Sequence, residues 1–279
     1  MNRELISVIL PVYKSNCSFL KRSIISILDQ TYDNLEVIVI IDTSSKKQDV
    51  SIFETLDTFR DDHRIKTIVR STKGYCSALN TGILISKGSF IARLDSDDYW
   101  ASSKIQEQME LVTSSKIALV GTWSNLIDEN GVKKGEIRTP ISPKSIRDRI
   151  MLHNPFVHSS VLFAKHIAKK VGQYNDVFDG AEDYEFYLRI VSKGYSCANV
   201  PRLLTYLRES RDSIMRGSNW PKTRKSYCLA KWEAVSRLGY CRISDLLLTF
   251  TSFGSLLVTP KLGTHLKKAT GWYNHTQIH

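Results

Sequence analysis

Short apolar runs alternate with segments of helical periodicity between residues 5 and 121. The apolar runs predict strands at Leu5–Leu10, Glu36–Ile41, Ile65–Val69, Phe90–Leu94 and Ile117–Gly121. The segments between them predict helices near Cys17–Gln30, Val50–Phe59, Cys76–Ser86 and Ser102–Thr113. Residues Val37–Ile41 are all apolar, as in a parallel sheet that helices cover on both faces. The alternation predicts an α/β fold with a doubly wound, mostly parallel sheet, whose ligands bind outside the carboxyl ends of its strands.

The pattern is less regular after residue 121. Asn154-Pro155 precedes an apolar stretch, a helix is predicted from Glu182, and a last strand is predicted over Leu203–Leu207. After residue 214 the chain becomes basic, which indicates a helical C-terminal appendage.

The charge of the chain is concentrated near its end. The net charge is +11, and from Pro201 onward thirteen Lys and Arg stand against four acidic residues, which accounts for +9 of it. Such a basic segment suggests an anionic partner: nucleic acid, phospholipid or substrate phosphate. The five cysteines lack zinc-site spacing and the first apolar run is too short for a signal peptide, so we expect reduced thiols and a cytoplasmic location.

Asp95, Asp97 and Asp98 follow the predicted strand Phe90–Leu94 directly. Carboxylates this close repel one another, so the cluster needs a compensating partner. A divalent cation fits, because Mg²⁺ takes one or two protein carboxylates and completes its shell with phosphate oxygens and water. An acidic turn that caps the next helix would use the same residue types. The cluster alone leaves both interpretations open.

Two further acidic positions occupy comparable places. Asp42 ends the second predicted strand, and Glu182-Asp183 begin a helix. Each is unremarkable alone, since Asp is a common turn residue and carboxylates favour the positive end of the helix dipole. Together with the cluster they suggest a nucleotide-diphosphate donor, a metal and a separate base. No dinucleotide fingerprint or P-loop follows any of the predicted strands.

Six short segments form an ordered set of motifs. They are Ser7-Val8-Ile9-Leu10-Pro11-Val12-Tyr13, Ser26-Ile27-Leu28-Asp29-Gln30-Thr31-Tyr32, Ala78-Leu79-Asn80-Thr81-Gly82, Ile91-Ala92-Arg93-Leu94-Asp95-Ser96-Asp97-Asp98, Asn154-Pro155-Phe156-Val157-His158 and Ala181-Glu182-Asp183-Tyr184. Together they resemble glycosyltransferase family 2, and the likeness covers roughly residues 5–210. The resemblance implies the GT-A fold, with a Rossmann-like sheet flanked by helices. It also implies transfer of a sugar from a nucleotide donor, usually with inversion at the anomeric carbon.

The resemblance assigns a donor and metal site. Asp42 would hold the edge of the nucleobase, and Asp97 would bind a divalent cation, Mn²⁺ or Mg²⁺, with Asp95 facing the ribose or the metal. Arg93 would reach a phosphate or form a structural salt bridge. The other donor-binding residues implied are Pro11, Val12, Tyr13 and Ser96. The chain departs from the family just after the second predicted strand. The family often has two acidic residues followed by Gly-Ser there, whereas this chain has Ile41-Asp42-Thr43-Ser44-Ser45.

The resemblance also implies a catalytic pair. Asp183 matches the general base that removes the proton of the acceptor hydroxyl, and Glu182 would orient the loop or the acceptor. His158 would either shape the acceptor pocket or be a packing residue. Arg208 and Arg211 follow the last predicted strand, where relatives often carry an arginine near the donor phosphates.

The expected organisation is a catalytic domain over residues 1–215, with a nucleotide-binding half (1–98) and an acceptor half (99–215) that includes a variable loop at Trp123–Pro143. Residues 216–279 would form a basic amphipathic tail. Its apolar stripe (Leu246, Phe250, Phe253 and Leu257) is shorter than the roughly 20 residues that a membrane-spanning helix needs. The tail is therefore expected either to lie in a membrane interface or to pack on the catalytic domain.

The function predicted is an inverting transferase that uses a nucleotide sugar, with UDP-sugars as the first choice. Its expected acceptor is a glycan or a lipid-linked glycan of cell-surface polysaccharide synthesis, at the cytoplasmic face of a membrane. A nucleotidyltransferase is one alternative, although Pro11–Ser15 lacks the glycine-rich phosphate loop that it needs. A basic nucleic-acid-binding protein is another, but no reading motif supports it and no nucleic acid is expected as a partner.

Overall fold

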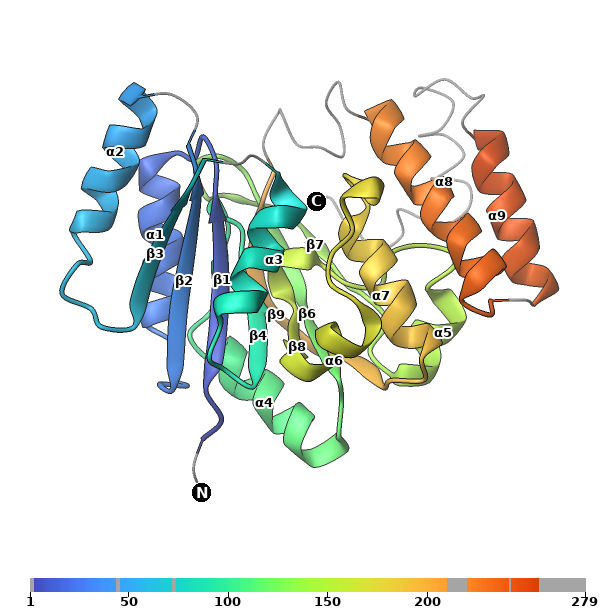
Figure 1. Cartoon of the computed structure of the whole chain (residues 1–279). Coiled ribbons are helices and arrows are strands. Elements are labelled where there is room, and N and C mark those ends of the chain that lie inside the picture. Colours follow the sequence, from blue (N-terminus) through green and yellow to red (C-terminus); the bar gives the residue numbers. More distant parts are fainter. Residues whose placement is uncertain (1–2, 44–45, 72–73, 210–219, 241, 256–279) are drawn as a thin grey trace.

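The structure is a computed structural model that describes residues 3–43, 46–71, 74–209, 220–240 and 242–255. Within these residues the strands form one nine-stranded sheet in the order β3-β2-β1-β4-β8-β6-β9-β5, and β7 pairs with β6 (Figure 1). Helices lie on both faces of the sheet. The predicted α/β architecture is thus confirmed.

The first half of the sheet is wholly parallel. β1 (Ile6–Val12) lies between β2 (Leu35–Asp42) and β4 (Phe90–Arg93), and β3 (Ile65–Arg70) pairs with the outer side of β2. Every residue of β1 is buried. Val37–Ile41 of β2 are buried as well, which confirms the expectation from their all-apolar sequence, because helices cover both faces.

The second half is mixed. β8 (Leu162–Ala164) runs antiparallel between β4 and β6 (Leu119–Ile127), and β6 is parallel to β9 (Cys197–Arg208). β5 (Tyr99–Trp100) and β7 (Lys133–Ile137) pair antiparallel with β9 and β6. The prediction of a variable loop over Trp123–Pro143 is therefore wrong at two places. Trp123–Ile127 form the end of β6, and Lys133–Ile137 form β7, which pairs with it. The β7 sequence, Lys-Lys-Gly-Glu-Ile, carries no alternating apolar pattern that would predict a strand.

Successive residues of the central strands enter two different cores. On one face Ile9, Ile38 and Ile40 pack with α3 (Tyr75–Ile85), α5 (Pro143–Arg149), α6 (Lys165–Val171) and α7 (Glu182–Ser192). On the other face Val8, Leu10 and Val39 pack with α1 (Cys17–Leu28), α2 (Lys46–Asp57) and α4 (Lys104–Ser115). This division follows from the two-residue period of a strand. Each such buried side chain contributes roughly 1.5–3 kcal/mol relative to exposure.

Two helices follow β9 in the described part of the chain, α8 (Trp220–Arg237) and α9 (Ile243–Ser255). α8 packs on α7, and Ala230 and Ala234 of α8 are fully buried in the same core as α7. α9 packs on α8, where the Cys228 thiol and Lys231 Nζ donate to Ser252 O (3.3 Å) and Ser252 Oγ (2.9 Å). Among the described residues no helix has the length and apolar character to cross a membrane.

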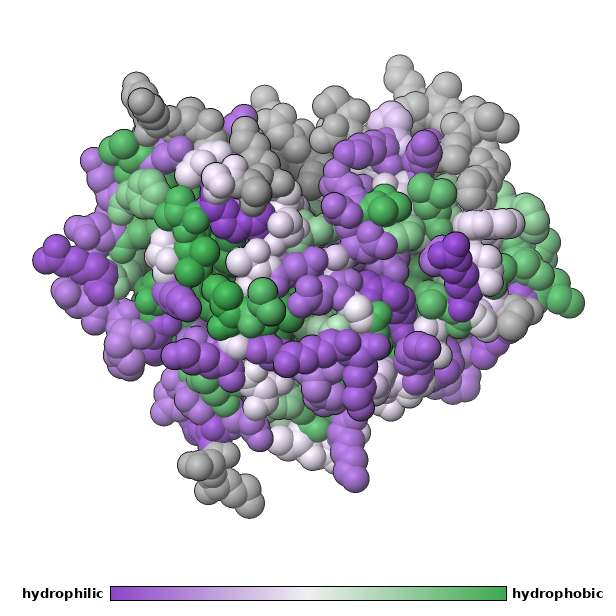
Figure 2. Space-filling view, in the orientation of Figure 1, coloured by the Kyte–Doolittle hydropathy of each residue, from purple (hydrophilic) through white to green (hydrophobic). Residues whose placement is uncertain are grey.

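α9 has two faces. Asp245 and Thr249 are buried toward α8, whereas Ile243, Leu247 and Phe250 are exposed by 78%, 59% and 62%. Figure 2 shows the apolar surface over α9 at the right edge of the molecule. Packing on the domain thus coexists with an exposed apolar stripe. Phe253 and Leu257 of the predicted stripe lie outside the residues whose side chains are described.

Candidate active site

The three aspartates after β4 converge at the carboxyl end of the parallel strands. One carboxylate oxygen from each of Asp95, Asp97 and Asp98 lies within 4.8 Å of the others. Their loop is tied to the segment after β1, because the hydroxyls of Ser96 and Ser15 share a hydrogen bond. The cluster supplies the hard oxygen ligands that Mg²⁺ and Mn²⁺ prefer, so these residues fit a divalent cation.

The three carboxylates differ in their partners. Asp98 is buried, and its oxygens accept from the Arg208 N–H (2.7 Å) and from the Ser159 hydroxyl. Asp95 accepts from the Arg93 guanidinium and from the Tyr75 hydroxyl (3.1 Å). Within the described chain, no other residue's side chain donates to the Asp97 carboxylate. Asp97 is therefore the member of the cluster with oxygens free to bind a cation.

Burial and mutual repulsion shift the titration of the cluster. Burial first, and then the charge of Asp95, raises the pKa of Asp97 to about 6. Burial and the charges of Asp97 and Asp95 raise the pKa of Asp98 well above its usual value. A bound cation would relieve this repulsion, since an opposite charge favours the ionised form.

Two arginines hold the acidic loop in place. Arg93 is 1% exposed, and besides its ion pair with Asp95 it donates to Ser159 Oγ (3.0 Å). Of the two roles expected for Arg93, the structure thus shows the salt bridge. Arg208 donates to the carbonyl oxygens of Asp97 (3.0 Å), Asp128 (2.7 Å) and Glu129 (2.8 Å). These contacts make Arg208 an anchor of the loop. Arg211 lies outside the described residues.

The predicted base-binding residues lie beside this loop. Pro11 and Val12 end β1 in the core, and Tyr13, which follows them, is 48% exposed. At the end of β2, Asp42 accepts from the Gly74 N–H (3.1 Å) and lies 3.3 Å from Arg70 Nε.

The start of α3 joins Asp42 to the acidic cluster. Gly74 contacts Asp42, and the next residue, Tyr75, contacts Asp95. Two consecutive residues therefore connect the ends of β2 and β4.

The predicted catalytic pair, Glu182 and Asp183, lies at the first turn of α7. Asp183 is half-buried, and its two oxygens accept from Asn154 Nδ2 (2.8 Å) and from the Tyr184 N–H (2.6 Å). Glu182 is buried and accepts from the Gly180 N–H (2.7 Å). Burial raises the pKa of Asp183, and burial together with the charge of Asp183 raises the pKa of Glu182 to about 7. The positive charge of Arg93 opposes both shifts, so this pair lies within electrostatic reach of the acidic loop.

An aromatic group lies between the two acidic sites. His158 Nε2 is 3.1 Å from the Tyr174 hydroxyl, and the His158 ring lies 6.1 Å from the Tyr75 ring and 6.3 Å from the Tyr187 ring, centroid to centroid. Burial and the charge of Arg93 lower the pKa of His158 well below its usual value, which keeps the ring neutral. His158 thus packs among Tyr75, Tyr174 and Tyr187, and its role in the acceptor pocket stays a prediction.

Sequence reasoning missed the residues that orient these carboxylates. Tyr75, Asn154, Ser159 and Tyr174 contact predicted site residues, but each is a common residue type far away in sequence. Asn154 could have been found, because it belongs to the Asn154–His158 motif.

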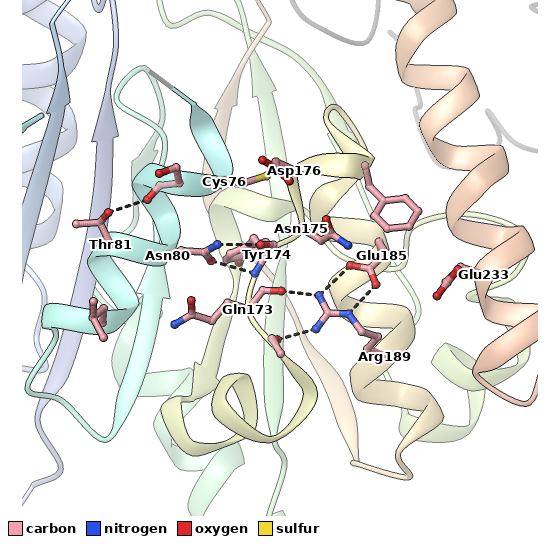
Figure 3. A pocket seen from close by; sticks show the side chains of 14 residues that line it. Cys76, Asn80, Thr81, Gln173, Tyr174, Asn175, Asp176, Glu185, Arg189 and Glu233 are labelled. Carbon is pink, nitrogen blue, oxygen red and sulfur yellow. Dashed lines mark hydrogen bonds and ion pairs between the residues drawn. The ribbon is translucent and has the colours of Figure 1, made fainter. Parts of the chain in front are cut away.

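A separate groove of about 740 Å³ opens between α3 and α7 (Figure 3). None of the predicted catalytic or metal residues lines it. Several of its polar groups are already paired: Asn80 exchanges two hydrogen bonds with the backbone of Tyr174, and Arg189 binds Glu185. This groove is thus distinct from the acidic site.

Comparison with known proteins gives consistent results. The family model described as "Glycosyl transferase family 2" matches residues 7–169. The O-antigen biosynthesis glycosyltransferase WbnJ of Escherichia coli is 31% identical over 198 residues, which are 71% of this chain and 74% of that protein. UDP-Glc:alpha-D-GlcNAc-diphosphoundecaprenol beta-1,3-glucosyltransferase WfaP of Escherichia coli is 30% identical over 214 residues, 76% of this chain and 80% of that protein.

Solved structures share the fold. TarS 1–349 of S. aureus in complex with UDP-GlcNAc has a TM-score of 0.64 at 13% identity, covering 90% of this chain and 80% of that one. This chain spans only 40% of the longer TarS chain. The mannosyltransferase PcManGT of Pyrobaculum calidifontis, in complex with GDP-Man and Mn²⁺, has a TM-score of 0.64 at 14% identity. The match covers 98% of this chain and 81% of that one. At these identities the likeness concerns the fold alone.

Proposed function

Because the chain belongs to glycosyltransferase family 2, we propose that it transfers a sugar, with inversion, from a UDP-sugar to a hydroxyl of a glycan or lipid-linked acceptor. Relatives named for O-antigen and amylovoran biosynthesis support a role in cell-surface polysaccharide synthesis. The observation that carries the proposal is the free carboxylate of Asp97 beside Asp95, connected through packed aromatic residues to Asp183. Nothing in the described structure favours either alternative function.

Different residues on the donor side of the site would contact the base, the ribose with its diphosphate, and the cation. Asp42 accepts hydrogen bonds at the base edge, Pro11-Val12-Tyr13 line the base, and Asp95 and Ser96 face the ribose and diphosphate. Asp97, with Asp95, would hold Mn²⁺ or Mg²⁺, and such a cation supplies Lewis-acid stabilisation of charge on the diphosphate. The ligands named for the solved neighbours, UDP-GlcNAc in one and GDP-Man with Mn²⁺ in the other, support a nucleotide sugar and a divalent cation as the ligands.

The acceptor side uses Asp183 as the base. An acceptor hydroxyl donates its proton to an Asp183 oxygen while its own oxygen forms a bond to the anomeric carbon, and the bond from that carbon to the diphosphate breaks. A carboxylate with a raised pKa accepts the proton more readily, and general-base catalysis contributes typically ~10²–10⁴-fold. Asn154 fixes the orientation of the carboxylate through its 2.8 Å hydrogen bond. Attack opposite the leaving group follows the logic of inverting glycosidases.

The acceptor and location form the last part of the proposal. WfaP and WfgD are named for transfer to GlcNAc-diphosphoundecaprenol, which supports a lipid-linked acceptor. The exposed apolar face of α9 supports contact with the membrane that holds such a lipid. The proposed location is the cytoplasmic face of that membrane.

Binding and turnover test this function separately. UDP-glucose, UDP-galactose and UDP-GlcNAc are titrated with and without Mn²⁺, and release of UDP is then followed with GlcNAc-diphosphoundecaprenol as acceptor. We expect Mn²⁺-dependent binding of a UDP-sugar, and Asp183→Asn should keep that binding but lose turnover by at least ~10²-fold. Asp61→Asn, whose side chain is 96% exposed, is the matched control. Absence of Mn²⁺-dependent binding, or normal turnover by Asp183→Asn, would refute the proposal.

A further inference from the structure

Helix α8 contacts the turn that leads into the proposed base. The Ser226 hydroxyl donates to the carbonyl oxygen of Asp179 (2.8 Å), and Lys222 forms an ion pair with the Asp179 carboxylate. Asp179 lies four residues before Asp183. Both α8 and Asp183 lie outside residues 7–169, the part that the family model matches.

The turn approaches α8 too closely for a side chain at Gly180. A Cβ at this glycine would lie 2.8 Å from the Thr223 hydroxyl, and the positive φ of +85° independently favours glycine. Thr223 is only 2% exposed, so it has little room to move aside. The Gly180 N–H donates to Glu182, so the conformation that Thr223 imposes extends to the residue next to the base.

A second contact joins α8 to α7 at the base itself. The Tyr227 ring stacks on the Tyr184 ring, with centroids 4.9 Å apart and planes inclined by 19°. The Tyr184 N–H donates to the Asp183 carboxylate. The Tyr184 hydroxyl donates to the Ile150 carbonyl oxygen (2.7 Å), and this bond fixes the Tyr184 ring. Burial and the charge of Asp183 raise the pKa of Tyr227, and a side-chain hydrogen bond with Asn154 opposes the shift. Tyr227 therefore lies close to both Asp183 and its amide partner.

We propose that α8 positions the catalytic base: Thr223 and Ser226 set the turn at residues 179–181, and Tyr227 holds Tyr184 and Asn154 against Asp183. The inference rests on the proposed function, in which Asp183 is the base. It makes the first half of α8 a support of the proposed base and not an appendage to the catalytic domain. These are positioning residues, since they act on the acceptor hydroxyl only through Asp183.

The expected effect concerns turnover and not donor affinity. Asp183 accepts a proton only when it lies within hydrogen-bond reach of the acceptor hydroxyl, and a misplacement of about 1 Å can cost ~10²-fold. The double variant Ser226→Ala/Tyr227→Phe removes two hydroxyls from α8 but keeps the stacked ring. We expect its kcat to fall by about tenfold or more, while KM for the UDP-sugar changes less than about twofold.

The experiment measures kcat and KM for wild type, the double variant, Ser226→Thr/Tyr227→Phe, Asp183→Asn and Ser236→Ala, with UDP release as readout. Ser236 is an exposed α8 serine whose hydroxyl binds its own helix, so its variant should match wild type. Restoring a hydroxyl with Ser226→Thr should recover part of kcat. Hydrogen exchange over residues 176–186 should be faster in the double variant and unchanged in Ser236→Ala.

The outcomes separate the two levels of the proposal. If Asp183→Asn is inactive but the double variant keeps normal kcat, the inference about α8 is wrong and the proposed base stands. If Asp183→Asn turns over normally, the proposed base itself is wrong. A rise in donor KM with unchanged kcat would also overturn the inference, since it would place α8 in donor binding.

Discussion

Among single residues, the acidic cluster shows how neighbours divide one residue type into different roles. The Asp98 carboxylate accepts hydrogen bonds from the Arg208 N–H and the Ser159 hydroxyl. In the described chain no other residue's side chain donates to the Asp97 carboxylate, which can therefore bind a cation. A buried N–H that loses its acceptor costs roughly 1–3 kcal/mol, whereas losing a ligand weakens the metal site and not the fold. The two aspartates should therefore respond differently to the same substitution.

Asp97→Ala and Asp98→Ala test this division. We expect Asp97→Ala to weaken Mn²⁺-dependent UDP binding by at least about tenfold, because the coordination of the cation is lost, with little change in Tm. Asp98→Ala should lower the free energy of unfolding by about 1–3 kcal/mol, because it leaves the Arg208 N–H unpaired. Calorimetric UDP titration with and without Mn²⁺, and urea unfolding of the metal-free protein, measure the two effects. Retained Mn²⁺ dependence in Asp97→Ala would contradict this division.

Glu182 provides a pH-dependent prediction. Its folded pKa of about 7 lies above the ordinary 4.5, so its contribution to stability is fully present below 4.5 and lost as pH rises through 7. Glu182→Gln keeps an acceptor for the Gly180 N–H but carries no charge. The variant should be about 1–3 kcal/mol more stable than wild type at pH 8.5, with the difference nearly absent at pH 4.5. Urea unfolding of metal-free protein at both pH values checks this, and a pH-independent difference would argue against it.

The sequence identified the acidic residues but not their partners. Asp42, Asp95, Asp97 and Asp183 stand at strand ends or a helix start, where a local pattern marks them. Ser159 reaches Asp95 across 64 positions of the chain, and such contacts depend on tertiary packing that no local pattern records.

At the scale of elements, α7 both carries the proposed base and anchors the segment before it. Arg189 binds Glu185 one turn earlier and donates to the carbonyl oxygens of Val171, Gly172 and Gln173. This fork closes the connection between α6 and η2 (Asp176–Phe178), along the groove of Figure 3. Arg189 and Glu185, two of the charged residues that line the groove, therefore hold the fold together at this place.

Arg189→Lys tests this role of α7. An ammonium group cannot make the planar, forked contacts of a guanidinium to a carboxylate and three carbonyls. We expect the free energy of unfolding to fall by about 1–3 kcal/mol, with Mn²⁺-dependent UDP affinity unchanged. Arg60→Lys, at a side chain that is 69% exposed, is the matched control and should unfold like wild type. Loss of UDP affinity in Arg189→Lys at unchanged stability would instead link the groove to donor binding.

Most of the elements that the sequence predicted are buried on both sides or on one regular face. β1 and β2 are mostly apolar and almost wholly buried, and the regular apolar face of α1 packs against the sheet. β5 has only two residues and β7 is charged and partly exposed, so backbone pairing with longer strands forms them without a long apolar run.

At the scale of the whole molecule, a succession of packed helices joins the acidic site to the apolar face of α9. α7 carries the proposed base, α8 packs on α7, and α9 packs on α8 (Figure 1). In this region the described residues 220–240 and 242–255 carry six Lys and Arg against two acidic residues. An apolar stripe combined with positive charge favours an anionic lipid surface, to which each nearby Lys or Arg contributes about 1 kcal/mol.

A vesicle-binding experiment tests whether α9 contacts a membrane. Leu247→Glu/Phe250→Glu replaces two exposed apolar side chains, each of which gains roughly 1.5–3 kcal/mol when fully buried in an apolar phase. We expect wild type to sediment with phosphatidylglycerol vesicles more than with phosphatidylcholine vesicles, and the variant to bind at least about tenfold more weakly at unchanged Tm. Leu84→Glu, at a 74% exposed position on α3, controls for added negative charge. Equal sedimentation of wild type and the α9 variant would exclude α9 as the contact, because a bilayer that engages this helix must bury its two most central exposed side chains.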